Sequence, residues 1–244
     1  MIKLLVTDLD DTLYSWIGFF IPAFYGMLDE LSLILSVSKS DLLDEYQHVH
    51  QEKGSVEYPF ATLYLPSVKA AYPGKTKEEL LNILNPVFHK FNSIRKKKLE
   101  LYPGVKETLE KIAGMGIKVV GYTDSAEENG FYRLKRLGID DYFQSVYVSD
   151  SQFELPNYLP ASEKTQIVHG KKPNPAVIHK ICQQESVAIG EIVYLGDSLT
   201  KDVYMARRAG ALSVLCKYSY NAKGQDELYS KLVAISHWTA TDFE

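Results

Sequence analysis

Short apolar runs alternate with polar clusters along most of the chain, which is typical of a sheet buried inside a layered protein. Four of the runs end directly in polar residues and a fifth follows a glycine; they cover residues 2–6, 117–122, 146–148, 192–195 and 212–216. Their length and β-branched content indicate strands that are buried on both faces. Helical patterns lie between them, so the expected fold is α/β: a Rossmann-like parallel sheet with helices on both faces.

Start and stop signals mark several of these helices. Residues 174–175, Asn-Pro, offer an N-cap followed by proline in the first turn. Residues 125–128, Ser-Ala-Glu-Glu, have the form of a capping box, and Gly138 is a stop signal further along. We therefore expect one helix to begin at Ser125 and another at Asn174.

The stretch from residue 16 to residue 98 breaks the alternation, because it contains no convincing strand. Residues 38–41 and 76–79 read as capping boxes, each followed by one apolar face at helical spacing. Pro86 lies inside the second pattern and should kink or split that helix. The window 17–37 is the most membrane-like, but its proline and central charges favour one or two buried helices.

This break predicts two domains. A small all-α cap domain is expected at residues 16–98, a size that domains commonly have. The catalytic core domain is expected to combine residues 1–15 with residues 99–244. The segment 151–170 is a long polar connection, and long loops of this kind often serve function.

Composition excludes several classes of protein. Of the 244 residues, 45% are hydrophobic and 24% charged, the balance of an ordinary soluble domain. The net charge of −4 favours neither nucleic acid nor an anionic membrane as a partner. Two cysteines without a CxxC pair indicate no disulfide framework and no zinc cluster. The apolar start is too short for a signal peptide, which together with the few cysteines favours a cytoplasmic protein. We expect a monomer or homodimer.

Side chains suited to catalysis gather where ligands bind in such a sheet, at the carboxyl ends of the strands. They follow predicted strands or start helices: Asp8, Asp10, Thr123, Lys171, Lys172, Asp197 and Asp202. Closely packed carboxylates repel, so a cation must join them or some must be protonated. Mg²⁺ suits such oxygen ligands together with a substrate phosphate. The set is typical of phosphoryl transfer through an aspartyl-phosphate, with a small phosphorylated metabolite as partner.

Four segments, in order, resemble the motifs of the haloacid dehalogenase superfamily. Residues 8–12, Asp-Leu-Asp-Asp-Thr, resemble its DxDxT signature, and Thr123 after an apolar strand resembles its second motif. Lys172-Pro173 resembles the third, and residues 196–202, GDSLTKD, resemble the fourth, GDxxxxD. The resemblance spans the chain and implies a phosphatase branch, similar to phosphoglycolate phosphatases, whose helical cap is inserted after the first motif.

The resemblance also implies roles in catalysis. Asp8 is similar to the family's nucleophile, and Asp10 resembles its general acid and, later, general base. Thr123 and Lys172 would bind the phosphoryl oxygens. Asp124 would lie beside them, where many relatives carry asparagine.

The same resemblance implies a Mg²⁺ site. The ion would be held by the Asp8 carboxylate, the backbone carbonyl of Asp10 and Asp197. Asp202 would either bind the metal through water or orient Lys172.

The expected function is Mg²⁺-dependent hydrolysis of a small phosphomonoester. The acid at position 10 favours a phosphatase over a dehalogenase, since the family's dehalogenases lack an acid there. Three alternatives stay open. A sugar phosphomutase would share every motif, and a phosphonate hydrolase would need a cap lysine, for which Lys53 and Lys69 are weak candidates. A binding or regulatory protein could use the same fold without catalysis.

Overall fold

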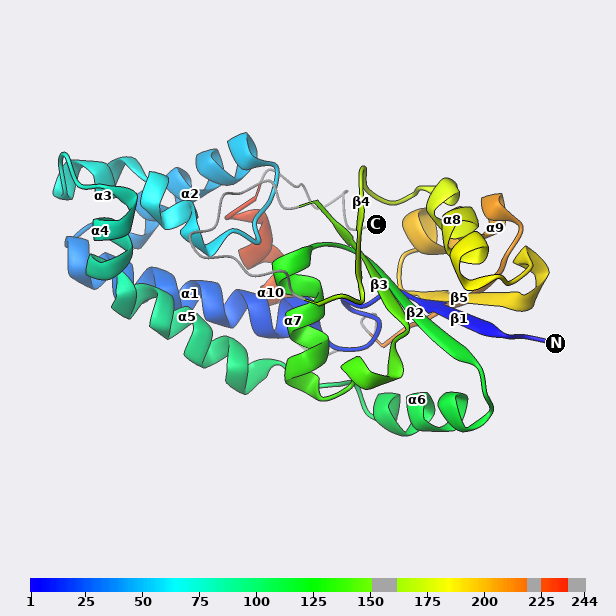
Figure 1. Cartoon of the computed structure of the whole chain (residues 1–244). Coiled ribbons are helices and arrows are strands. Elements are labelled where there is room, and N and C mark those ends of the chain that lie inside the picture. The colour runs from blue at the N-terminus through cyan, green and yellow to red at the C-terminus, as the bar shows by residue number, and fades with distance from the viewer. Residues whose placement is uncertain (151–161, 219–224, 237–244) are drawn as a thin grey trace. The chain divides into compact units, whose positions relative to one another are not determined.

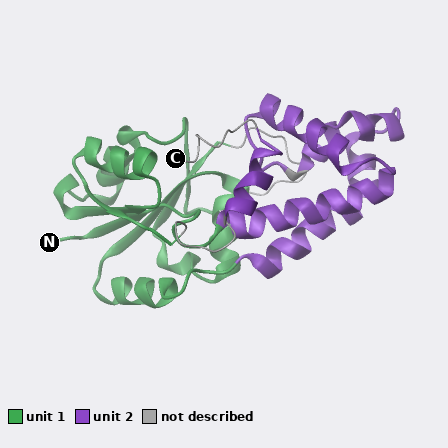
Figure 2. Cartoon of the chain, turned by 180° about the vertical axis from the view of Figure 1, so that it is seen from behind, with its two compact units in different colours: residues 1–15, 100–222 green, residues 16–99, 223–244 purple. Residues whose placement is uncertain are grey.

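The computed structural model describes residues 1–150, 162–218 and 225–236 (Figure 1). The chain forms two compact units, shown separately coloured in Figure 2. Unit 1 takes in residues 1–15 and 100–222, and unit 2 takes in residues 16–99 and 223–244.

Unit 1 is built on a six-stranded parallel sheet with the order β4-β3-β2-β1-β5-β6. The strands are β1 (Leu4–Thr7), β2 (Lys118–Ala126), β3 (Ser145–Ser149), β4 (Thr165–Val168), β5 (Ile192–Gly196) and β6 (Leu212–Leu215). The central strand β1 is buried at every position, as its apolar sequence predicts. In the register, Thr7 lies between Gly121 of β2 and Leu195 of β5, so β1 ends beside the end of β5, while β2 continues past both.

Helices cover both faces of this sheet, as Figure 1 shows for α6 on one side and α8 and α9 on the other. The helical elements are α6 (Val105–Gly114), α7 (Glu127–Leu137), η2 (Asp140–Tyr142), α8 (Pro175–Glu185), η3 (Ile189–Glu191), the π-helical turn η4 (Leu199–Val203) and α9 (Tyr204–Ala209). Apolar side chains of α8 and α9 form one continuous core with β1, β2 and β5. The predicted Rossmann-like fold is confirmed.

Two local predictions for unit 1 are wrong. Strand β2 continues through Ala126, which pairs with Ser149, so Ser125 belongs to a strand and α7 begins only at Glu127. The expected capping box at residues 125–128 therefore does not form. Strand β4 was not expected, because its four residues lie at a sheet edge and show no clear alternation. It lies within the long connection at 151–170, of which residues 151–161 are outside the described part.

The regular elements of unit 2 are all helices within its described residues, 16–99 and 225–236, where no strand occurs. Its elements are α1 (Trp16–Leu35), α2 (Lys39–Lys53), η1 (Pro59–Tyr64), α3 (Pro66–Ala71), α4 (Lys77–Ile83), α5 (Asn85–Lys98) and α10 (Gln225–Val233). Ser38 caps α2, and Thr76 with Glu79 forms the expected capping box of α4. Pro86 lies in the first turn of α5 and separates it from α4, as predicted.

Helix α1 is long and apolar enough to cross a membrane by length and composition alone. In unit 2, however, 56% of its most apolar window is buried. Its side chains pack on other helices of the unit: Phe20 meets the ring of Phe91 from α5, and Phe24 meets Tyr46 from α2. The helix has the contacts of a core helix, as its proline and central charges predict.

The C-terminal helix differs from the expected domain division. Residues 99–244 are all expected in the core domain, but α10 and residues 234–236 after it belong to unit 2. The Tyr25 hydroxyl donates to the carbonyl of Lys231 at 3.1 Å, and the Gln47 amide donates to that of Ser236 at 2.8 Å. Ile235 is fully buried. Unit 2 is thus closed by a segment that returns from the far end of the chain.

Candidate active site

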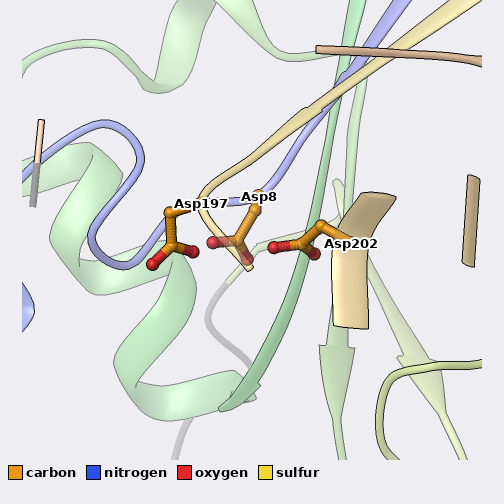
Figure 3. Close-up of side chains that lie close together, drawn as sticks. All are labelled: Asp8, Asp197 and Asp202. Atoms are coloured by element: carbon orange, nitrogen blue, oxygen red, sulfur yellow. The ribbon is translucent and has the colours of Figure 1, made fainter. Parts of the chain in front are cut away.

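Three carboxylates of unit 1 meet at the carboxyl edge of the sheet. Asp8 follows β1 directly, and its backbone N–H donates to the carbonyl of Leu195 at 2.8 Å, which ties it to the end of β5. Asp197 follows β5, and Asp202 lies in η4. Figure 3 shows the side chains of Asp8, Asp197 and Asp202 turned toward one another, and one oxygen of each lies within 4.8 Å of the others.

Lys172 joins two of these carboxylates. Its buried ammonium donates to Asp8 and, at 2.9 Å, to Oδ1 of Asp202. The same nitrogen lies 5.0 Å from the centre of the Tyr122 ring, close enough for a cation–π contact. The backbone N–H of Lys172 donates to Oδ1 of Asp124 at 2.9 Å. Asp124, expected beside the substrate phosphate, thus holds the loop that carries the lysine.

Asp202 is surrounded by donors. Besides Lys172, the Tyr194 hydroxyl donates to Oδ1 at 3.0 Å and the backbone N–H of Ser198 donates to Oδ2 at 3.1 Å. Its close approach depends on Gly196, where a Cβ atom would lie 2.4 Å from the Asp202 carboxyl carbon. Steric contact with Asp202 therefore explains why the fourth motif has a glycine at position 196. Of the two roles expected for Asp202, this geometry favours anchoring Lys172.

Burial and crowding set the acidities in this cluster. Burial raises the pKa of Asp8 well above its usual value, and the charges of Asp202, Asp197 and Asp10 add to the rise while Lys172 opposes it. Burial and the charge of Asp202 raise the pKa of Asp197 to about 6. Although burial disfavours its charge, the Asp202 and Asp8 carboxylates hold the pKa of Lys172 well above its usual value. The lysine stays charged, and it faces more negative charge than it can balance.

This imbalance fits a divalent cation. Three carboxylates face one ammonium, and the hard oxygen ligands are those that Mg²⁺ prefers. Asp8 and the half-buried Asp197 supply carboxylate oxygens, and the Thr12 hydroxyl holds Asp8 in place by donating to its Oδ2 at 3.1 Å. The residues present are therefore suited to hold the ion that the motifs imply.

Asp10, two residues beyond Asp8, has separate partners. Thr123 and Ser125 donate hydroxyl hydrogens to its Oδ2 at 3.1 Å and 2.8 Å. Arg133 from α7 donates to Oδ1 at 2.7 Å and to the Ser125 hydroxyl at 2.9 Å. The structure thus brings Asp10 and Thr123 together as the motifs imply, with the Thr123 hydroxyl directed at the carboxylate.

Arg133 and Ser125 were missed by sequence reasoning, as was Tyr194. Arg133 lies one helical turn after Gly130, whose missing side chain lets α7 approach Thr123 closely. A glycine and a charged residue three positions apart, on a helix that follows the second motif, were the available signal. Unless the position of α7 against the strand ends is known, that spacing does not identify Arg133 as a partner of Asp10.

Comparisons with known proteins bear on the whole chain. The model of the family described as haloacid dehalogenase-like hydrolase matches residues 6–216. A phosphoglycolate phosphatase of Nitrosospira multiformis is 27% identical over 98% of this chain and 94% of its own. A glyceraldehyde 3-phosphate phosphatase of Methanopyrus kandleri is 28% identical over 88% of this chain and 83% of its own.

Solved structures share the fold across nearly the full length. A 2-haloacid dehalogenase of Pseudomonas syringae aligns with a TM-score of 0.55 at 22% identity, over 95% of this chain and 100% of its own. A HAD phosphatase of Thermococcus onnurineus aligns with a TM-score of 0.52 at 22% identity, over 91% of this chain and 90% of its own. At this identity they show the fold alone. The matched family model makes the chain a member of the haloacid dehalogenase-like hydrolase family, which confirms the family and the hydrolase class that the four motifs imply.

Proposed function

We propose that the protein is a Mg²⁺-dependent phosphatase that hydrolyses a small phosphomonoester through an aspartyl-phosphate on Asp8. One observation carries the proposal: a buried carboxylate held by a buried lysine lies two residues from a second carboxylate with its own donors. The names of the two curated relatives support a small phosphorylated metabolite as substrate. In this proposal the protein acts in the cytoplasm as a monomer or homodimer, and neither nucleic acid nor a membrane is its partner.

In the first step, an oxygen of Asp8 forms a bond to phosphorus while the bond from phosphorus to the leaving oxygen breaks. Asp10 gives its proton to that oxygen, so the alcohol departs neutral. Lys172 and Thr123 offset the charge on the phosphoryl oxygens, for which the Thr123 hydroxyl turns from Asp10. In the second step, Asp10 takes a proton from water, the water oxygen bonds to phosphorus, and the bond to Asp8 breaks.

The proposed metal site consists of Asp8, Asp197 and the backbone carbonyl of Asp10. A bound Mg²⁺ would supply the positive charge that lets an anionic phosphate approach the carboxylates. Asp202 is assigned to orient Lys172, because the lysine, the Tyr194 hydroxyl and the Ser198 backbone N–H all donate to it. Asp124 is assigned to hold the Lys172 loop through the backbone.

Phosphate release from a substrate panel tests the proposal. The panel holds phosphoglycolate, glyceraldehyde 3-phosphate, several sugar phosphates and p-nitrophenyl phosphate, each with Mg²⁺ and with a chelator. We expect Mg²⁺-dependent release that falls roughly 10⁴-fold or more in Asp8→Asn, the scale of losing a covalent nucleophile. Release that survives this substitution would contradict the nucleophile. Phosphate that moves between positions of a sugar without release would identify a mutase.

A further inference from the structure

We infer that Arg133 is a positioning residue for the proton-transfer steps: it fixes the orientation of the Asp10 carboxyl from α7. The inference rests on the proposed function, because the role of Asp10 belongs to it. Arg133 lies outside all four motifs, in the middle of a helix, with only 2% of its surface exposed. A buried guanidinium is costly unless it is paired, and here its partner is Asp10.

The contacts around Asp10 form a closed set. Arg133 reaches Oδ1 directly, and the Ser125 hydroxyl accepts from Arg133 while donating to Oδ2. A carboxyl whose two oxygens are both held has neither side-chain torsion free. The fully buried Tyr14 also interacts with Asp10 and Arg133. Besides Thr123, residues outside the metal and phosphate sites therefore hold the Asp10 carboxyl in its orientation.

The Thr123 hydroxyl shows why Asp10 needs Arg133 and Ser125 as further donors. It donates to Asp10 in the structure, but the proposed mechanism directs it to the phosphoryl group. When Thr123 turns to substrate, Arg133 and Ser125 still hold Asp10. The position of Arg133 is itself fixed, because a Cβ atom on Gly130, one turn earlier, would lie 3.1 Å from Thr123 and 3.3 Å from Val148. Helix α7 is thus packed directly against the strand that carries the second motif.

The test uses Arg133→Met in the full chain with a series of phosphomonoesters whose leaving groups differ in basicity. A misplaced acid matters most where the leaving oxygen most needs a proton. We expect kcat/KM to fall roughly 10²-fold for an alkyl phosphate, the scale of misplacing a catalytic group. The loss should be about tenfold smaller for p-nitrophenyl phosphate. Arg136→Met, which removes an exposed arginine from the same helix, should change neither.

A double-mutant comparison separates positioning from general damage. If Arg133 acts through Asp10, Arg133→Met should reduce kcat/KM by less than about twofold when added to Asp10→Asn. Equal losses for all leaving groups, or a full additional loss in Asp10→Asn, would overturn the inference. So would an Arg133→Met rate equal to or above that of the wild-type protein.

Folding and the proposed function are checked in the same series. Melting temperatures show whether each variant folds, and if Arg133→Met does not, Arg133→Lys keeps the charge while losing the planar fork. That variant should show the same dependence on leaving group, with a smaller loss. Wild-type turnover that is absent, or that survives Asp8→Asn, overturns the proposed function and the inference together. Normal Asp8-dependent turnover with an unaffected Arg133→Met overturns the inference alone.

Discussion

Two groups of side chains share one edge of the sheet and differ in charge balance. The nucleophile group consists of Asp8, Lys172, Asp197 and Asp202, and the acid–base group consists of Asp10, Thr123, Ser125 and Arg133. In the nucleophile group three carboxylates face one ammonium. In the acid–base group one carboxylate faces one guanidinium and two hydroxyls.

Because their charge balance differs, only the nucleophile group requires additional positive charge or protons. The nucleophile group is short of positive charge, so a divalent cation or protons must complete it, as the raised pKa values of Asp8 and Asp197 indicate. The acid–base group is balanced by its own arginine. Two aspartates only two residues apart are thus prepared for different work by the elements that surround them.

The largest expected effect on the nucleophile group comes from Lys172→Met. It removes the only ammonium that the structure places against Asp8 and Asp202 within the described residues. We expect kcat/KM to fall roughly 10²- to 10³-fold, the scale of removing a preorganised charge from a developing anion. Lys171→Met is the matched control, since Lys171 is the exposed neighbour and should leave the rate unchanged. Equal losses in both variants would contradict the assignment of the third motif to Lys172.

Gly196→Ala should have the next largest effect. Its new methyl group would lie 2.4–2.5 Å from three atoms of Asp202. The Asp202 carboxylate, and Lys172 which it anchors, must therefore shift. We expect kcat/KM to fall by roughly 10²-fold, as for small misplacements of catalytic groups. Gly190→Ala is the control, because no atom lies within 4 Å of the added carbon. A Gly196→Ala rate near that of the wild-type protein would show that Asp202 is not needed where it lies.

The same contrast explains what the sequence could reveal. Every residue of the nucleophile group lies in a loop or turn just after a strand or before a helix, where motif spacing places it. Arg133 lies inside a helix and meets Asp10 across 123 positions of sequence, so only the tertiary structure pairs them. The sequence around Ser125 fits a helix-cap pattern. In the structure, however, Ala126 pairs with Ser149 of β3, so β2 extends past Ser125.

The fold shows the same division between local and distant causes. The apolar runs of β1 and β5 predict these central strands; β1 is buried at every position, and β5 alternates between buried and half-buried residues. Strand β4 depends on pairing with β3 at an edge, and only one of its four residues is buried. The C-terminal segment that contains α10 belongs to unit 2 through contacts such as that of His50 Nδ1 with the carbonyl of Ile235, 185 positions away. No local pattern records a contact of that kind.

Acidity gives a smaller, thermodynamic test of the comparison. Because folding raises the pKa of Asp197 to about 6, the folded chain holds its proton more tightly than the unfolded chain does. This group therefore stabilises the metal-free protein most at low pH, and its contribution falls as pH rises toward about 6. Mg²⁺ needs the ionised carboxylate, so its stabilising effect should grow over the same range.

The measurement is the melting temperature with Mg²⁺ and with a chelator, from about pH 5 to about pH 8. We expect Mg²⁺ to raise it by several degrees at the upper end and by much less at the lower end. Asp197→Asn should remove most of this rise, while Asp10→Asn, from the balanced group, should keep it. A rise that is equal at all pH values, or lost only in Asp10→Asn, would reverse the assignment of the two groups.

Ser125→Ala should have the smallest effect, and it tests how the acid–base group shares its work. The substitution removes one of the donors on Asp10 but leaves Arg133 on the other oxygen. We expect kcat/KM for an alkyl phosphate to fall roughly 2- to 10-fold, the equivalent of one hydrogen bond. Ser213→Ala, the same change in β6, is the control. A loss as large as that of Arg133→Met would mean that the arginine acts on Asp10 only through the serine hydroxyl, because the two variants would then break the same link.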